Sequence, residues 1–349
     1  MTTRRVVKRA LFFQEYTMNV YKPTYFDTFR CIASNCPDSC CQEWGVQVDE
    51  ASAAFYRNLP GDLGDRLRQV LVEEDGETVI TIENRRCPMW RQDGLCRIQA
   101  ELGHDALCKT CREFPRLTHD YGDFVEMGLE LSCPEAARLI LADVTGEQVV
   151  TEIDGGEPAD YDGDAMNVLK ATREYALSLL SDPAYAPNQA LALLLVYGYQ
   201  AQQILDGDEP PEFDPELILE QVSGMAKPTN TEDMFRFFET LEILTSQWAE
   251  RLQNPGAPLP WMEEFRSLAR YFLQRYWLQA VSDYDLVCRV KLMVISCLVI
   301  RNLGGELAQT AQRYSKEIEN NADNIDAILD AAYENPVFTD DKLLYLLQR

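Results

Sequence analysis

Thiols that can bind a metal are concentrated in the first part of the chain. Nine of the eleven cysteines lie between Cys31 and Cys133, and only Cys288 and Cys297 lie outside that region. Thiolates bind soft or borderline metal ions, and a set of four suits Zn²⁺ or an iron–sulfur cluster. In a reducing cytosol such a set is typical of metal binding rather than of disulfides. The cysteines therefore predict a metal or cluster site.

The spacing of the cysteines narrows the kind of site. One run reads FRCIASNCPDSCC at 29–41, and a second begins with CPMW at 87–90 and ends with CKTCREFP at 108–115. A plain zinc ribbon would show two Cys-x-x-Cys knuckles, and only Cys108 and Cys111 have that spacing. The adjacent Cys40 and Cys41 point in different directions on most backbones, which favours either a cluster with spare thiols or two separate sites. Cys288 and Cys297, inside an apolar helical stretch, are expected to be inert core residues.

The charge of the chain favours cationic partners. Its 32 Lys and Arg residues and 57 Asp and Glu residues give a formal net charge of −25. Such a field repels phosphate backbones and anionic lipids, so we expect no nucleic acid partner, whereas a lysine-bearing protein surface would be attracted. The most apolar run, 292–300, is too short to span a membrane. The basic start, MTTRRVVKRALFF, lacks the apolar length of a secretory signal, and Met18 offers an alternative first residue. We therefore expect a cytoplasmic protein without a transmembrane segment.

Hydrophobic patterns predict a mainly α protein with a small cysteine-rich α+β N-terminal region followed by an all-helical domain. Alternation predicts strands at 78–83 and 124–131 and a short one at 45–49. Helices are expected from Asp49 to about Leu59, around 63–71, and over 133–143 with Ser132 as the N-cap. An acidic, Gly- and Pro-rich linker at 154–163 separates a cysteine-rich domain at 19–153 from a helical domain at 164–349. In the latter, helical periodicity predicts helices at 165–181, 189–205, 215–225, 231–252, 261–281, 286–302, 306–320 and 325–334, and a last one at the C-terminus.

Several of these motifs together resemble the bacterial flagellin lysine-N-methylase family. They are Tyr21-Lys22-Pro23, FRCIASNCPDSCCQEW, CPMW, LCRIQAELG, CREFPR and LELSCPEAARLIL, in this order over about residues 19–143. The cysteine core is also similar to that of a broader family of zinc- or iron-chelating proteins with a Cys-Cys pair. The resemblance implies a cytosolic enzyme that transfers a methyl group from S-adenosylmethionine to lysine side chains of flagellin. It also implies a [4Fe-4S] cluster, with zinc as the alternative metal.

The resemblance further implies which thiols hold the metal. Cys108 stands where the family has another residue, so we expect it to be an extra thiol. Because the matching thiols outnumber the four ligands of one cluster, the resemblance does not assign them individually. They are Cys31, Cys36, Cys40, Cys41, Cys87, Cys96, Cys111 and Cys133.

The usual motifs for S-adenosylmethionine are absent from the sequence. It has no Gly-rich turn of the Rossmann type and no Cys-x3-Cys-x2-Cys triad, because Cys36-x3-Cys40 continues directly into Cys41. We therefore expect an atypical cofactor site, and no catalytic residue is assigned. His104 and His119 are candidates for a ligand or a proton acceptor, and a surface or capping role is the alternative for each. The competing function is a non-enzymatic iron–sulfur or zinc-binding protein whose helical half binds a partner.

Overall fold

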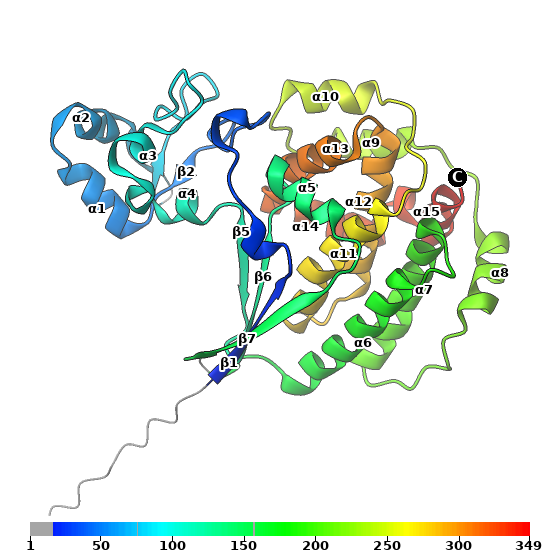
Figure 1. Cartoon of the computed structure of the whole chain (residues 1–349). Helices are drawn as coiled ribbons and strands as arrows, with labels where there is room; N and C mark the ends of the chain where they lie inside the picture. The colour runs from blue at the N-terminus through cyan, green and yellow to red at the C-terminus, as the bar shows by residue number, and fades with distance from the viewer. Residues whose placement is uncertain (1–16, 75, 156–157) are drawn as a thin grey trace, which may run out of the picture.

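A small lobe and a larger, mainly helical body make up the molecule (Figure 1). The computed structural model describes residues 17–74, 76–155 and 158–349, so the basic leader MTTRRVVKRALFF lies outside the described residues. The small lobe holds a three-stranded sheet of order β2-β4-β3, with strands Val46–Gln47, Glu77–Ile80 and Leu71–Glu74 respectively. Its helices are α1 (Glu50–Asn58), α2 (Gly61–Val70), α3 (Arg97–Leu102) and α4 (Lys109–Glu113).

Local signals account for the helices of the small lobe. The Asp49 carboxylate accepts a hydrogen bond of 3.0 Å from the Ser52 backbone N–H, which satisfies a free donor at the start of α1. Leu63, Leu67 and Val70 follow at helical spacing in α2 and are buried. The strand expected at 78–83 is shorter and ends at Ile80, while the short strand near 45–49 and both helices are confirmed.

A second sheet lies against the helical body, with the strand order β5-β6-β1-β7. Strand β1 (Thr17–Pro23) pairs in parallel with β6 (Phe124–Leu129) and antiparallel with β7 (Gln148–Asp154), while β5 (Arg116–Asp120) pairs antiparallel with β6. Strand β7 was not expected, because its residues are exposed and show no buried alternation. Pairing with β1, more than a hundred residues earlier in the chain, makes this segment a strand.

The helix that follows β6 begins one residue later than expected. Helix α5 spans Pro134–Ala142, and its N-cap is Cys133 rather than the predicted Ser132. The Ser132 hydroxyl instead donates to the Glu130 carboxylate, at 3.1 Å. Pro134 at the first helical position fixes a helical backbone there, which places the cap at the residue before it.

The rest of the described chain is helical, and the mainly α fold class is confirmed. A 3₁₀ segment (Trp277–Val281) extends α11, and a π-helical turn (Ser315–Glu319) follows α13. Among the described residues, no helix is both long and apolar enough to cross a membrane. The helices are α6 (Gly163–Ser181), α7 (Pro187–Leu205), α8 (Pro215–Met225), α9 (Glu232–Phe238), α10 (Ser246–Gln253), α11 (Glu264–Tyr276), α12 (Val287–Leu303), α13 (Leu307–Tyr314), α14 (Ala322–Glu334) and α15 (Asp340–Leu347).

The single helix expected at 231–252 is two helices, α9 and α10. Thr245 ends the break between them, because its hydroxyl accepts from the Trp248 N–H at 3.1 Å and starts α10. Glu317, from the π-helical turn, accepts from the Leu244 N–H at 2.8 Å and holds the break in place. A contact from a distant element therefore interrupts a helical pattern that is continuous in the sequence.

Two hydrophobic cores form, and they do not separate at the expected linker. One lies within the small lobe and is built from residues between Val46 and Cys108. The other joins Phe26 and Leu131 to Phe272 and Tyr314, on both sides of the linker. The domain ranges 19–153 and 164–349 therefore remain a prediction. The two hydrophobic cores belong to the small lobe and to the larger body, which includes the second sheet.

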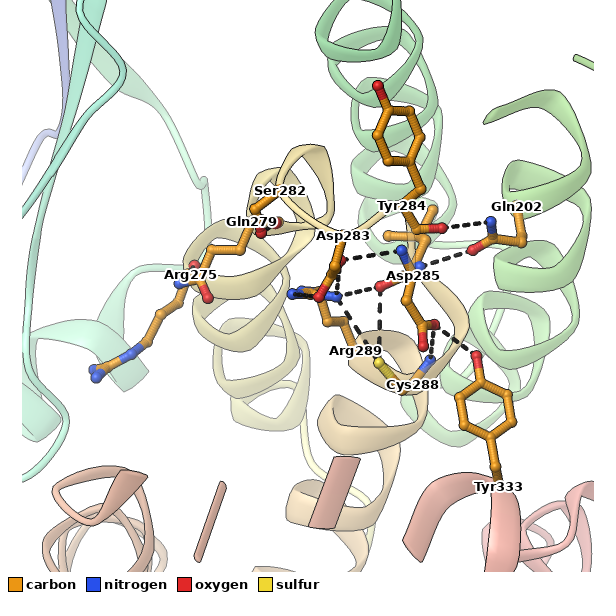
Figure 2. A network of polar contacts seen from close by, with 11 residues as sticks. Gln202, Arg275, Gln279, Ser282, Asp283, Tyr284, Asp285, Cys288, Arg289 and Tyr333 are labelled. Carbon is orange, nitrogen blue, oxygen red and sulfur yellow. Dashed lines mark hydrogen bonds and ion pairs between the residues drawn. The ribbon is translucent and has the colours of Figure 1, made fainter. Parts of the chain in front are cut away.

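A polar network ties the start of α12 to its neighbours (Figure 2). Arg289 pairs with both carboxylate oxygens of Asp283, at 2.9 and 2.7 Å, and the Tyr333 hydroxyl donates to Asp285 at 2.6 Å. The Cys288 thiol donates to the Asp285 carbonyl at 3.7 Å. Cys288 and Cys297 are both buried in α12, as expected of core residues.

Candidate metal centre

A first group of thiols, Cys31, Cys36, Cys40 and Cys133, lies where the chain passes from β1 to the small lobe and at the start of α5. Cys31 accepts from the Ala33 N–H at 3.4 Å, and the Cys36 thiol donates to the Asp38 carbonyl at 3.0 Å. Burial raises the pKa of Cys133 to about 11, and the nearby thiols of Cys36 and Cys31 contribute. The thiols of this group therefore lie near enough to one another to influence each other's pKa.

A second group, Cys41, Cys87, Cys96, Cys108 and Cys111, belongs to the small lobe. The Cys87 N–H donates to the Cys41 carbonyl at 2.8 Å, and Cys87 and Cys108 are part of the small-lobe core with Cys41 and Cys96 packed against them. Burial raises the pKa of Cys87 to about 12, with contributions from the thiols of Cys41, Cys96 and Cys108. Cys96 and Cys108 are the N-cap residues of α3 and α4.

The two groups meet at the Cys40-Cys41 pair. The interaction with the Cys41 thiol raises the pKa of Cys40, and Cys31 and Cys133 of the first group add to the effect. The interaction with the Cys108 thiol raises the pKa of Cys111, and Cys41 and Cys40 add to it. The structure thus places the eight thiols of the expected set, and also Cys108, which the resemblance left out, in one region of the molecule.

The described residues, 17–74, 76–155 and 158–349, do not form a complete set of ligands around one metal position. Within them, no three Cys, His, Asp or Glu side chains are close enough together to hold a metal ion. The donors nevertheless fit a thiolate-bound metal in kind and number, because each group supplies at least four sulfur atoms. Cys31, Cys40 and Cys111 are exposed, so solvent reaches both groups.

A contact from the C-terminal half holds the loop that carries Cys36 and Cys40. Lys316, only 5% exposed, pairs with the Asp38 carboxylate at 2.8 Å, and its ammonium lies 4.9 Å from the centre of the Trp44 ring. Gln312 donates to Asp38 at 2.9 Å and to the Ser132 carbonyl, next to Cys133, at 2.8 Å. The α13 segment therefore bridges the two parts of the chain that form the first thiol group. Sequence reasoning missed this contact, since nothing local marks a lysine in a helix as a partner for a residue 278 positions away.

A small cavity with a few polar side chains lies between the second sheet and α11. Its volume is about 40 Å³, and its lining includes His119 and Glu126 from the sheet and Arg275 from α11. Within the part of the chain that the structure describes, the His119 Nε2 atom is buried without a hydrogen-bond partner. Burial and, to a smaller extent, the charge of Arg275 lower the pKa of that imidazole. Figure 2 shows Arg275 pointing away from the Asp283 network. The other candidate histidine, His104, is exposed at the start of a 3₁₀ turn.

The Arg275 side chain is anchored by a buried carboxylate. Its Nε atom lies 3.3 Å from Glu319, whose side chain is 0% exposed, and its Nη1 donates to the Tyr271 hydroxyl at 2.7 Å. The Tyr271 and Tyr276 hydroxyls donate to Glu319 at 3.1 and 2.9 Å. Glu319 ends the π-helical turn, so one short turn supplies Lys316 to the thiol loop and Glu319 to Arg275, which lines the cavity. π-helical turns are frequent at functional sites.

The fold and the thiols define a mainly α, cysteine-rich protein. Comparison with known sequences then identifies its relatives. The Lysine-N-methylase of Salmonella typhimurium is 32% identical over 133 residues, which cover 36% of this chain and 33% of that protein. The flagellar biosynthetic protein FliU of Salmonella muenchen is 32% identical over 133 residues, which cover 79% of its length. A Lysine-N-methylase of Salmonella choleraesuis matches to the same extent as the first.

The chain belongs to the flagellin lysine-N-methylase family. Its match spans about a third of the length of the two Lysine-N-methylases. No family model and no solved structure matches the chain.

Proposed function

We propose that the protein transfers a methyl group from S-adenosylmethionine to lysine side chains of a flagellin, and that its gathered thiols hold an iron–sulfur cluster. The observation that carries the proposal is the meeting of nine thiols from four separate stretches of the chain. Membership of the family supports the lysine substrate, since its curated relatives are named Lysine-N-methylase. The formal charge of −25 suits a cationic substrate.

The two thiol groups each bind metal. Each supplies at least the four sulfur ligands of one cluster, and the division at Cys40 and Cys41 favours two sites over one. A cluster held by only three thiolates of its group would supply an open iron position for the amino and carboxylate groups of S-adenosylmethionine. Among the chain's own residues, Asp38 and its partners Lys316 and Gln312 hold the first group in position.

Transfer requires a neutral lysine amine. The bond between the methyl carbon and the sulfonium sulfur breaks as the bond to the lysine nitrogen forms, so the substrate ammonium must first lose a proton. We assign His119 as the acceptor of that proton, because its Nε2 has no partner among the described residues and burial lowers its pKa, which favours the neutral imidazole. The cavity beside it has room for an ammonium group.

The test is anaerobic purification followed by iron and sulfide analysis, an absorption spectrum and a methylation assay. We expect iron and inorganic sulfide in roughly equal amounts, and additions of 14 Da on flagellin lysines, detected by peptide mass spectrometry. The rate should rise with pH through the neutral range, because the reference lysine pKa is about 10.4. The His119→Gln variant should keep its iron and lose most of the rate.

Two outcomes would contradict the proposal. Colourless protein with stoichiometric zinc and no sulfide would replace the cluster by a zinc site. Iron-loaded protein that neither binds S-adenosylmethionine nor methylates flagellin would support the non-enzymatic metal-binding function instead.

The contact between Lys316 and Asp38 leads to a further prediction. Lys316→Met keeps the length of the buried side chain and removes its charge, so the loop between Cys36 and Cys40 loses its ion pair. We expect a chelator to remove iron about tenfold faster, the usual scale for a residue that supports metal ligands. The colour of the released iron–chelator complex gives the rate.

The matched control is Lys227→Met, which removes an exposed lysine paired with Asp341 at 2.7 Å. This variant should release iron at the wild-type rate. If Lys316→Met also releases iron at the wild-type rate, Asp38 does not position the thiols.

A further inference from the structure

The outer edge of the second sheet is formed by β7. This strand pairs with β1 over seven residues and, in the strand order β5-β6-β1-β7, has no neighbour on its other side among the described residues. All seven of its residues are exposed. Half of the backbone N–H and C=O groups of such a strand point outward, where another strand can bind them.

This edge carries the charged residues Glu152 and Asp154 but lacks two other features that protect an edge strand from pairing, proline and lysine. Its sequence, QVVTEID, contains no proline and no lysine. Val149, Val150 and Ile153 are 41%, 52% and 42% exposed, and two adjacent valines place apolar surface on both faces of the strand. An exposed apolar strand of this length is suited to strand addition.

The negative charge in and next to β7 favours a positively charged partner. Between Arg138 and Lys170 the sequence contains eight acidic residues and no Lys or Arg. A second copy of this chain would set these carboxylates against their own equivalents, which is repulsive. A lysine-rich segment would instead place its cations against Glu147, Glu152 and Asp154, which lie in β7 or directly before it.

We propose that the free edge of β7 binds an extended, lysine-bearing segment of a partner protein by strand addition. The backbone of the segment pairs with β7, its lysine ammonium groups face the acidic residues, and the lysine methylenes cover the valines. Gln148, the first residue of β7, lines the cavity that contains His119. A strand added at β7 therefore passes the Gln148 end of that cavity, whereas His119 lies in β5 at the opposite edge of the sheet. In taking the partner as the methylation substrate, the inference rests on the proposed function.

Binding is tested separately from methylation. Two labelled ten-residue peptides, one alternating Lys with Val and one alternating Glu with Val, are titrated with the full chain and followed by fluorescence anisotropy. We expect the lysine peptide alone to bind, and its affinity to fall as salt is added. Glu152→Lys should weaken binding, whereas Glu220→Lys, at an exposed position of α8, serves as a control for the same change of charge.

Two proline variants at adjacent positions of β7 test whether its outer edge is the binding site. Neighbouring residues of a strand direct their N–H groups to opposite sides, so one of Val150→Pro and Thr151→Pro blocks only the outer side and keeps the pairing with β1. That variant should retain the wild-type melting temperature and bind the lysine peptide about tenfold more weakly, because outward hydrogen bonds are lost.

The inference is overturned if both peptides bind equally, or if both proline variants bind the lysine peptide as the wild type does. It is also overturned if the chain forms dimers that the outward-blocking proline abolishes, since the edge then serves a second copy. Binding at β7 without any methylation refutes the proposed function alone. Methylation that is unaffected by the outward-blocking proline refutes the docking site alone.

Discussion

Replacing Cys40, Cys41 or Cys111 by Ala is expected to abolish loading of at least one metal site, whereas Cys297→Ala leaves the metal content unchanged. Cys40 belongs to the first thiol group, Cys41 to the second, and the Cys111 thiol interacts with both Cys40 and Cys41. A cluster that loses one of its four thiolates is usually not retained. Iron per chain and the absorption spectrum measure the effect.

Cys297 provides the control for destabilisation. It is fully buried in α12, away from both thiol groups, and the loss of its small side chain costs about 1–2 kcal/mol of unfolding free energy. A urea unfolding curve for each variant separates this effect from ligation. Equal loss of iron in all four variants would mean that instability, and not ligation, removes the metal.

A comparison of Cys36→Ala with Cys87→Ala distinguishes one metal site from two. Cys36 lies in the first thiol group and Cys87 in the second. If the groups are separate sites, each variant should retain about half of the iron, as four thiolates complete one cluster. If either variant loses all of it, the nine thiols form a single site.

Among substitutions outside the thiol region, Glu319→Ala is expected to cause the largest decrease in the free energy of unfolding. The carboxylate has 0% exposure and accepts from two tyrosine hydroxyls while pairing with Arg275. Its removal leaves a buried guanidinium without its counter-ion, which typically costs about 3–5 kcal/mol. Urea unfolding followed by circular dichroism measures the change.

The double variant Glu319→Ala with Arg275→Met tests the cause. Because it removes both charges, it should be less destabilised than the sum of the two single variants. The exposed pair of Arg236 and Asp233, at 3.2 Å, offers a control, and Asp233→Ala should cost less than about 1 kcal/mol. A comparable small loss for Glu319→Ala would show that the buried pair contributes little.

The local elements of this protein were predictable wherever a few neighbouring residues decide the backbone. Helix α8 spans the expected residues 215–225, because Pro215 stands at its first position and the Asp214 carboxylate caps the Leu217 N–H at 3.0 Å. Asp49 likewise starts α1. The mainly α class followed from periodicity, and the density of thiols identified the region of the candidate site from composition alone.

The sequence by itself thus determined the helices, their caps and the set of thiols, since these depend on interactions within a few residues. Only the tertiary structure decided how the thiols divide into two groups, that β7 is a strand, and that the helix expected at 231–252 is broken by Glu317. It alone brought Lys316 to Asp38. These features depend on contacts between residues far apart in the chain. Such contacts form according to which surfaces are buried in the two cores, so no local sequence pattern predicts them.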